Sequence, residues 1–267
     1  MLRDITLGQY YQAESVIHRL DSRVKLAGTV IYIISLFCFK NIWGYLCAAL
    51  FLAVVIRLSK VPFKFMIKGM RSIIFLLLIT VIFNLFLTPG ETVVAVWKLK
   101  ITKEGIRTAS FMAIRLSMLI IGSSVMTLTT TPNHLTDGLE KAMRPLKALR
   151  FPVHEIAMMM SIALRFIPIL LEETDKIMKA QIARGADFEN GNLLKRAKAL
   201  VPLLVPLFIS AFRRANDLAM AMEARCYRGG EGRTKMKPLV YKKRDAAAYV
   251  VLLAYLAGSI AIGRFLF

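Results

Sequence analysis

Acidic residues are scarce in this sequence. Its 267 residues include 17 Asp and Glu against 37 Lys and Arg, so the formal net charge is +20. In a soluble protein this excess would suggest nucleic-acid binding. Hydrophobic residues make up 57% of the chain and lie in long blocks. Basic loops retained on the cytoplasmic side of a membrane therefore explain the charge better, and we expect no nucleic-acid partner.

Cysteines and histidines are also few, which excludes several kinds of site. The three cysteines form no C-x-x-C pair, and this argues against a zinc knuckle and a disulfide framework. The three histidines are scattered, and no G-x-x-x-x-G-K-[ST] phosphate loop occurs. No nucleophile and base can be paired from the linear sequence. We therefore expect a protein that is not itself an enzyme and that needs no cofactor or metal.

The apolar blocks predict an all-α integral membrane protein with about five transmembrane helices. A bilayer-spanning helix needs about 20 apolar residues, and the blocks that reach or approach this length are 24–39, 45–56, 72–87, 108–130 and 246–267. The N-terminal stretch, Met1 to Gln12, lacks the basic-then-apolar order of a cleaved signal peptide. We expect a tight turn over residues 41–44, between the first two blocks.

The distribution of basic residues predicts the orientation. The segment from Arg57 to Arg71 carries five basic residues and no acid, so it should be a cytoplasmic loop. Residues 131–245 carry 21 basic and 12 acidic residues and should also be cytoplasmic. The segment Glu91 to Arg107 is placed outside, and the alternation in it suggests a short extended excursion. The predicted regions are 1–130 with four spans, 131–245 with long cytoplasmic helices, and 246–267 with the last span.

Arg115 lies inside the fourth predicted span. A charged side chain in a membrane is costly and can mark a functional site. Alternatively, Arg115 snorkels or pairs with a neighbouring helix as a packing element. The sequence leaves both alternatives open.

Two long helices are predicted in the cytoplasmic region. One runs from Val153 to Ala183 and the other from Leu193 to Ala224, with a polar turn at 187–192 between them. A shorter helix precedes them, with Thr131 as its N-cap and Pro132 as its first residue. The long helices either pack against the spans or form a platform for a partner. Their apolar stretches, 156–171 and 199–212, could also enter the bilayer.

Both long helices end in the same pattern of a small residue, Arg and a small residue. The ends are Ala183–Arg184–Gly185 and Ala224–Arg225–Cys226. Small flanking residues let a partner approach closely, and Arg offers a fork of donors to a carboxylate. Alternatively, each Arg only satisfies the last carbonyls of its helix. The repetition at both helices favours contact with a partner.

These paired ends resemble the T component of energy-coupling factor (ECF) transporters. The run 221–228 and the early stretch 18–26 resemble the same family, so the resemblance covers nearly the whole chain. It implies a multi-pass protein of the prokaryotic cytoplasmic membrane and an importer of vitamins or other micronutrients. Two ABC-type ATPases would hydrolyse ATP, and a small membrane protein, the S component, would bind the solute. Arg184 and Arg225 would each meet an acidic residue in one ATPase groove, although Cys226 replaces the family's usual Gly.

The resemblance also implies that the two helices cross, and we expect their crossing angle to change as the ATPases close. Their apolar faces would then contact the S component through Met158, Ile162, Phe166 and Ile169 on one helix and Leu200, Leu204 and Phe208 on the other. Met side chains suit a surface that accepts several partners, although they are equally suited to filling a core. Two other functions stay open: the permease subunit of a conventional ABC importer, and a channel or intramembrane enzyme.

Overall fold

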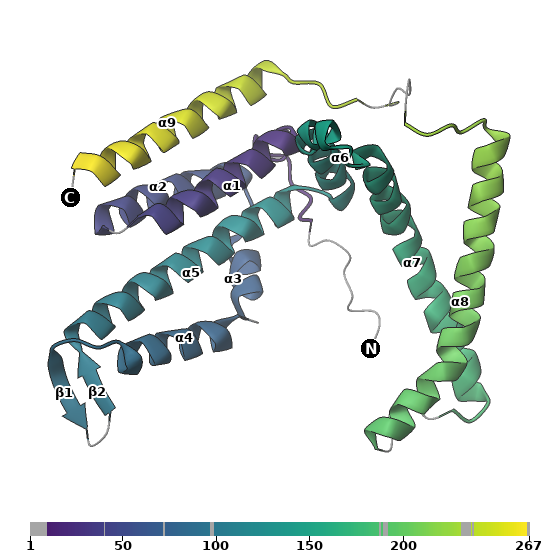
Figure 1. The fold of residues 1–267 in the computed structure, drawn as a ribbon, viewed down its shortest axis with the longest axis horizontal. Coiled ribbons are helices and arrows are strands. Elements are labelled where there is room, and N and C mark those ends of the chain that lie inside the picture. The colour runs from purple at the N-terminus through teal and green to yellow at the C-terminus, as the bar shows by residue number, and fades with distance from the viewer. Residues whose placement is uncertain are drawn as a thin grey trace. The chain divides into compact units, whose positions relative to one another are not determined.

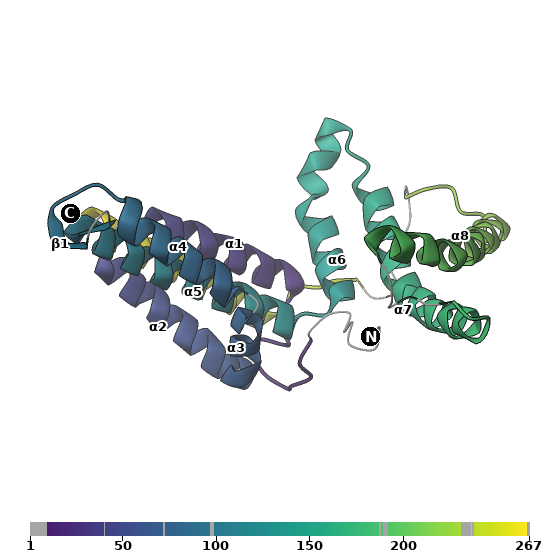
Figure 2. The same cartoon turned by 90° about the horizontal axis from the view of Figure 1, so that it is seen from below.

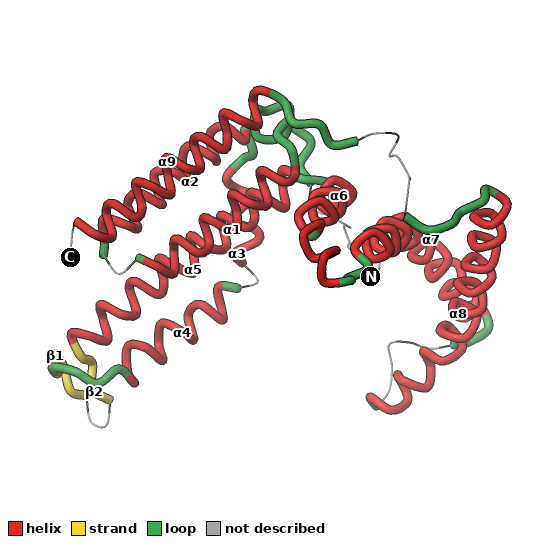
Figure 3. Tube along the Cα trace, turned by 45° about the horizontal axis from the view of Figure 1, so that its top comes forward, coloured by secondary structure: helices red, strands yellow, loops and turns green. Residues whose placement is uncertain are grey.

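The structure is a computed structural model that describes residues 10–39, 41–71, 73–96, 99–186, 188, 192–230, 236 and 238–265. Its helices are α1 (Ser22–Cys38), α2 (Ile42–Ser59), α3 (Phe63–Arg71), α4 (Ile74–Leu87), α5 (Lys103–Thr129), α6 (Pro132–Ala142), a 3₁₀ helix (Arg144–Leu149), α7 (Val153–Ala183), α8 (Leu193–Ala224) and α9 (Lys243–Phe265) (Figure 1). A small antiparallel hairpin, β1 (Thr92–Val96) and β2 (Leu99–Thr102), supplies the strands of the described part of the chain (Figure 3). The all-α prediction is confirmed, and the extended excursion is this hairpin.

The chain divides into two compact units. One contains residues 8–141 and 239–267, and we call it the bundle unit. The other contains residues 142–238, and we call it the long-helix unit. The chain therefore leaves the bundle unit after Lys141 and returns to it at Leu239.

Among the described residues, five helices are long and apolar enough to cross a membrane. They are α2, α5, α7, α9 over Lys243–Ile262, and the part of α8 from Lys198 to Ala224. The number agrees with the prediction of about five spans, but two of the predicted blocks are shorter than this limit. At about 1.5 Å per residue, α1 with 17 residues and α4 with 14 are shorter than a bilayer core of about 30 Å. The apolar stretches of α7 and α8 take their place by length and composition.

The bundle unit is organised around α5, which packs against α1, α2, α3 and α4. Figure 2 shows α4 lying along α5. Gly122 of α5 permits a close approach to α1, since a Cβ at this position would lie 2.5 Å from Cε1 of Tyr32. Across the bundle, the rings of Phe51 on α2 and Tyr255 on α9 stack with centroids 4.3 Å apart. Aromatic packing thus joins the first, second and last helices.

Two predictions about the first half of the chain are wrong. Residues 42–44 are not a turn, because α2 already begins at Ile42 after Asn41 in the N-cap position. Gly44 is needed inside this helix because a Cβ there would lie 2.5 Å from the Phe39 ring. The segment 57–71 is not only a loop. Its second half forms α3, which follows Pro62 and buries Met66 completely.

Arg115 contacts the connection between α1 and α2. Its Nε donates to Tyr45 Oη at 2.9 Å, and its Nη2 donates to the Phe39 carbonyl at 3.4 Å. The guanidinium also lies 5.5 Å from the centroid of the Phe37 ring. A cation held by a hydroxyl, a carbonyl and an aromatic face matches the packing alternative.

The predicted bounds of the two long helices agree with α7 and α8, and α6 begins at Pro132 as expected. Thr131 Oγ1 accepts a hydrogen bond from the His134 amide at 3.4 Å, in the manner of an N-cap. The predicted polar turn at 187–192 lies largely outside the described residues. Most of the N-terminal stretch from Met1 to Gln12 also lies outside them.

The Arg-capped ends of two long helices

Helices α7 and α8 run antiparallel and cross within the long-helix unit (Figure 1). Near the end of α7, the side chain of Gln181 donates to the carbonyl of Pro202 at 3.3 Å. Further back along α7, Glu173 forms an ion pair of 3.2 Å with Arg214. Because the helices are antiparallel, the end of α7 lies beside the first half of α8. The C-terminal ends of the two helices therefore lie at opposite ends of the pair.

A cavity of about 260 Å³ lies at the crossing of the two helices. Its lining comes from Ile162, Phe166 and Leu170 on α7 and from Ala211, Arg214, Ala215, Leu218, Ala219 and Met222 on α8. Two of the residues expected to contact a partner, Ile162 and Phe166, thus face the companion helix. Met158 and Ile169 are half-buried.

An open apolar surface lies on α8. Leu200, Leu204 and Phe208 are 46%, 55% and 67% exposed. They recur every four residues and so share one face of the helix. Their exposed apolar neighbours are Val201, Val205, Ile209 and Phe212. Such a contiguous apolar face marks a surface that contacts another protein or lipid.

The C-terminus of α7 is a Schellman motif. Arg184 is the C-cap, and Gly185 after it adopts the left-handed conformation with φ of +87°. The Gly185 amide donates to the Ile182 carbonyl at 2.9 Å, and the Ala186 amide donates to the Gln181 carbonyl at 3.0 Å. These two bonds satisfy carbonyls that the helix end would otherwise leave without a donor.

The C-terminus of α8 repeats the two bonds of this motif. Arg225 is the C-cap, and Cys226 takes the left-handed position with φ of +54°. The Cys226 amide donates to the Glu223 carbonyl at 2.8 Å, and the Tyr227 amide donates to the Met222 carbonyl at 3.0 Å. Cys at this position therefore ends the helix as Gly does, although a left-handed conformation is unfavourable for any residue with a Cβ.

Both arginines are exposed, together with the small residues beside them: Ala183, Gly185, Ala224 and Cys226. Neither the Arg184 nor the Arg225 guanidinium has a hydrogen-bond or ion-pair partner among the described residues. The last carbonyls of each helix are satisfied by backbone amides instead. The alternative that each Arg serves to cap its own helix therefore has no support in the geometry. The two guanidiniums remain available to an acidic group outside this chain.

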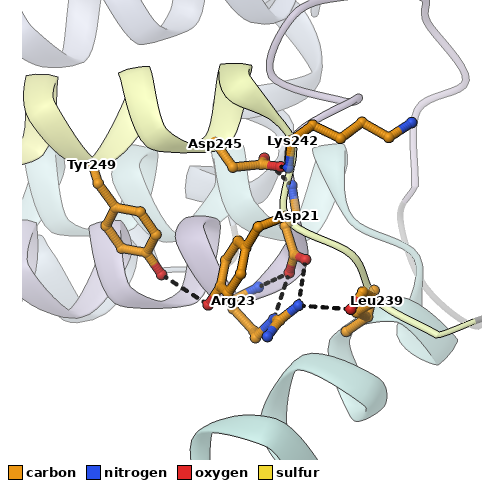
Figure 4. Close-up of polar contacts among 7 residues, drawn as sticks. Asp21, Arg23, Leu239, Lys242, Asp245 and Tyr249 are labelled. Carbon is orange, nitrogen blue, oxygen red and sulfur yellow. Dashed lines mark hydrogen bonds and ion pairs between the residues drawn. The ribbon is translucent and has the colours of Figure 1, made fainter.

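The sequence indicated only one part of a second polar cluster. The stretch from His18 to Leu26 stood out, and its Asp21 and Arg23 form an ion pair of 3.0 Å at the start of α1. Their distant partners, Leu239 and Asp245 before and within α9, were not found (Figure 4). The available signal was Asp245 in the first turn of the last helix, where an acid can accept from the backbone of the N-cap.

Comparisons with known proteins agree with one another. The model of the CbiQ family, described as cobalt transport protein, matches residues 13–236. The energy-coupling factor transporter transmembrane protein EcfT of Clostridium kluyveri is 54% identical over 262 residues, covering 97% of each chain. The EcfT of Thermosediminibacter oceani is 51% identical over 265 residues, covering 99% of this chain and 100% of the relative.

The EcfT of Bacillus subtilis is 46% identical over 258 residues, covering 96% of this chain and 97% of the relative. These matches cover the bundle unit and the long-helix unit alike. Together with the five helices of the described segments that are apolar enough to span, they identify a multi-pass transport subunit of the cell membrane. The chain therefore belongs to the CbiQ family, as a membrane-embedded T component of the energy-coupling factor transporter type.

Proposed function

We propose that this chain couples ATP hydrolysis by two ABC-type ATPase subunits to solute uptake by a small membrane-embedded S component. The solute is a vitamin or another micronutrient that the S component selects. This chain hydrolyses no ATP itself and transmits the movement of the ATPases to the S component. It therefore works as a coupling subunit and not as a solute-binding permease.

The repeated helix end carries this proposal. Arg184 and Arg225 occupy the same backbone position in two Schellman motifs, and both guanidiniums are exposed. The small residues on either side leave room for a surface to close around each arginine. A pair of equivalent docking ends suits a pair of equivalent ATPases. A conventional permease subunit would need only one coupling segment, and this difference favours the T component.

Each arginine is expected to dock into a groove of one ATPase and to pair there with a carboxylate. Because α7 and α8 are antiparallel, their C-terminal ends lie far enough apart to engage separate subunits. The 31 residues of α7 correspond to about 45 Å at 1.5 Å per residue. When the ATPases close on ATP, the two ends would move with their grooves and change the angle at which the helices cross.

The exposed apolar face of α8 is the proposed contact for the S component. Leu200, Leu204 and Phe208 form this face, and the rings of Phe208 and Phe212 lie 4.9 Å apart. Met158 and Ile169 of α7 are half-buried and would extend it, whereas Ile162 and Phe166 would contribute through the α7–α8 crossing. A change in crossing angle would then tilt the surface on which the S component rests.

A pull-down tests the docking part of the proposal. The tagged chain should bring two ABC-type ATPases and a small membrane protein from detergent-solubilised membranes. The Arg184→Glu/Arg225→Glu variant should lose the ATPases while remaining inserted in the membrane, because each buried charge pair would become a repulsion. The Arg165→Glu/Arg213→Glu variant is the matched control, since it reverses one exposed arginine on each of the same helices.

Two results would contradict the proposal. One is a wild-type chain that emerges alone or only with itself, which would favour a channel or an enzyme. The other is loss of the ATPases from the control variant as well, since a general charge effect would then explain the result. For the S component, Leu204→Gln/Phe208→Gln should release the small membrane protein and keep both ATPases. Retention of that protein would indicate that lipid covers this face.

A further inference from the structure

The first turn of α1 contains polar residues that the proposed docking of partners does not use. Asp21, Ser22 and Arg23 are all drawn into the bundle unit, and the first two are 9% and 4% exposed. In the described part of the chain, the backbone passes between the two units after Lys141 and before Leu239. Within the bundle unit, the segments that lead to both passages are held on this one turn.

The first passage is held by close packing. It follows α6, whose Gly138 lies so near to α1 that an added Cβ would be 2.8 Å from Ser22 Oγ. Thr136, half a turn earlier, is 3% exposed. A glycine is therefore required here for contact between α6 and the start of α1, and any larger residue must push the two apart.

The second passage is held by a cation. Arg23 Nη2 donates to the Leu239 carbonyl at 3.0 Å, and the guanidinium lies 3.8 Å from the centroid of the Tyr241 ring (Figure 4). Asp21 orients this group, accepting from Arg23 Nε at 3.1 Å and Nη2 at 3.0 Å. The side chain of Arg23 is only 17% exposed. The segment that returns to the bundle is thus fixed before α9 begins.

Asp245 locks the start of α9 to the start of α1. Its Oδ2 accepts from the Lys242 amide at 2.8 Å, and its Oδ1 accepts from the Asp21 amide at 2.9 Å. Asp245 is 2% exposed. One buried carboxylate therefore satisfies the backbone at two helix N-termini, where negative charge is also favoured by the helix dipoles.

We propose that Asp21, Ser22, Arg23 and Asp245 form a fixed anchor through which movement of the long-helix unit reaches the membrane helices. The inference rests on the proposed coupling function. A connecting segment transmits displacement only if its end is rigid, because a loose end absorbs the motion by local rearrangement. One passage ends on close packing against the buried Ser22 and the other on the hydrogen bond from Arg23, so displacement of either one is delivered to α1 and α9. These four are positioning residues that touch neither ATP nor solute.

The test uses the whole transporter in liposomes, with solute uptake and ATP hydrolysis measured together. Arg23→Gln should keep both ATPases and the S component bound and should keep ATP hydrolysis. Uptake per ATP should fall roughly tenfold, because loss of a buried hydrogen bond to a charged group shifts the equilibrium between the held and the loose connection by about that factor. Arg23→Lys should recover part of this ratio, because it restores the charge without the second donor.

Arg19→Gln is the matched control. Arg19 lies two residues before Asp21 and pairs with Glu14 at the surface, with side chains 60% and 88% exposed. A second test reaches the other passage, where Gly138→Ala should lower uptake per ATP in the same way by forcing α6 from Ser22. The Gly138→Ala variant tests the anchor even if the Arg23→Gln variant fails to assemble with its partners.

The outcomes separate the anchor from the proposed function. A wild-type chain that assembles with no ATPase would overturn the proposed function itself. A wild-type transporter that works, with Gly138→Ala and the Arg23 variants unchanged in uptake per ATP, would overturn the anchor alone. So would a parallel fall of uptake and hydrolysis in an intact complex, since the anchor would then only support the fold.

Discussion

The two units use polar residues in opposite ways. In the bundle unit, Asp21 and Asp245 are buried, and every bond that they accept comes from within the unit. In the long-helix unit, Arg184 and Arg225 stand at exposed helix ends, and their side chains have no partner among the described residues. Both sets occupy helix termini, where charged side chains are commonly found. Burial is what distinguishes them.

This difference separates holding a fold from recognising a partner. A buried polar group is costly unless it is paired, so its partners must be present in the same chain. An exposed arginine carries no such requirement, and it can keep its donors for another protein at little cost in stability. Substitutions in the two units should therefore affect different properties, stability in the bundle and assembly in the long helices.

The largest effect on stability is expected for Asp245→Ala. It leaves the amides of Asp21 and Lys242 without acceptors, and each buried unsatisfied donor costs about 1–3 kcal/mol. Thermal unfolding of the detergent-solubilised protein should show a clear fall in midpoint. Asp217→Ala, at an exposed acid of α8, is the control and should leave the midpoint almost unchanged. Equal shifts for the two variants would remove the distinction between the units.

The next effect concerns assembly. Arg184→Ala and Arg225→Ala should each weaken binding of the ATPases by roughly 2–5 kcal/mol, the usual loss when one partner of a buried charge pair is removed. The unfolding midpoint should stay the same for both, because neither guanidinium has a partner among the described residues. Quantitative pull-down at several ATPase concentrations measures the loss. If the two losses differ greatly, the helix ends are not equivalent docking sites.

Local sequence patterns were enough to predict the long-helix unit. The apolar periodicity and the breaks at Pro152 and after Ala183 and Ala224 define α7 and α8 to the residue. The Ala-Arg-small pattern predicted the candidate site because it lies within a few residues of one helix end. The matching Schellman bonds could be expected for Gly185. For Cys226 they could not, since its left-handed conformation runs against its own preference.

Long-range contacts could not be predicted in the same way. Asp21 and Asp245 are 224 residues apart, and nothing local indicates that one accepts from the backbone of the other. The start of α2 was missed because Gly44 is a residue type typical of turns. In the structure, Gly44 lies inside the helix and leaves room for the Phe39 ring. Packing across the bundle decided each of these positions, and a single sequence contains no direct signal of such packing.

A smaller effect is expected from exchanging the two left-handed residues. Cys226→Gly should stabilise the end of α8 by about 1 kcal/mol, because Gly adopts a positive φ without the steric cost of a Cβ. Gly185→Cys should destabilise the end of α7 by a similar amount. A Cβ at Gly185 would meet nothing within 4 Å, so only the backbone conformation should count. Hydrogen exchange of the amides at 185–186 and 226–227 measures both changes.

The double exchange, Gly185→Cys with Cys226→Gly, is the internal control. The amides at the end of α7 should exchange faster and those at the end of α8 more slowly. The summed stability of the two ends should stay nearly unchanged, since the two motifs have the same pair of backbone bonds. Additive behaviour is expected for ends this far apart. If Gly185→Cys had no effect, the left-handed conformation would not be the factor that limits the end of α7.

The smallest expected effect is on the pH dependence of stability, and it involves His18 of the bundle unit. His18 precedes α1, where its Nε2 donates to the Tyr11 carbonyl at 2.9 Å and its Nδ1 accepts from Ser15 Oγ at 2.7 Å. This arrangement uses the neutral ring with its proton on Nε2. The Tyr11 amide in turn donates to the Leu128 carbonyl at 2.9 Å, so the segment is attached to the end of α5.

Burial lowers the pKa of His18 below its usual value of 6.5, and the nearby Lys25 ammonium lowers the pKa further, while the Tyr11 carbonyl opposes the shift. A folded-state pKa below the unfolded one means that the unfolded chain binds the proton more readily. The stabilisation is therefore complete above pH 6.5 and is lost as the pH falls through the folded-state pKa. The unfolding midpoint of wild type should drop more between pH 7.5 and pH 5 than that of His18→Gln, which cannot titrate. His134→Gln, at an exposed histidine of α6, is the control and should keep the wild-type pH dependence. If the His18 variant kept that dependence as well, the segment before α1 would not be its source.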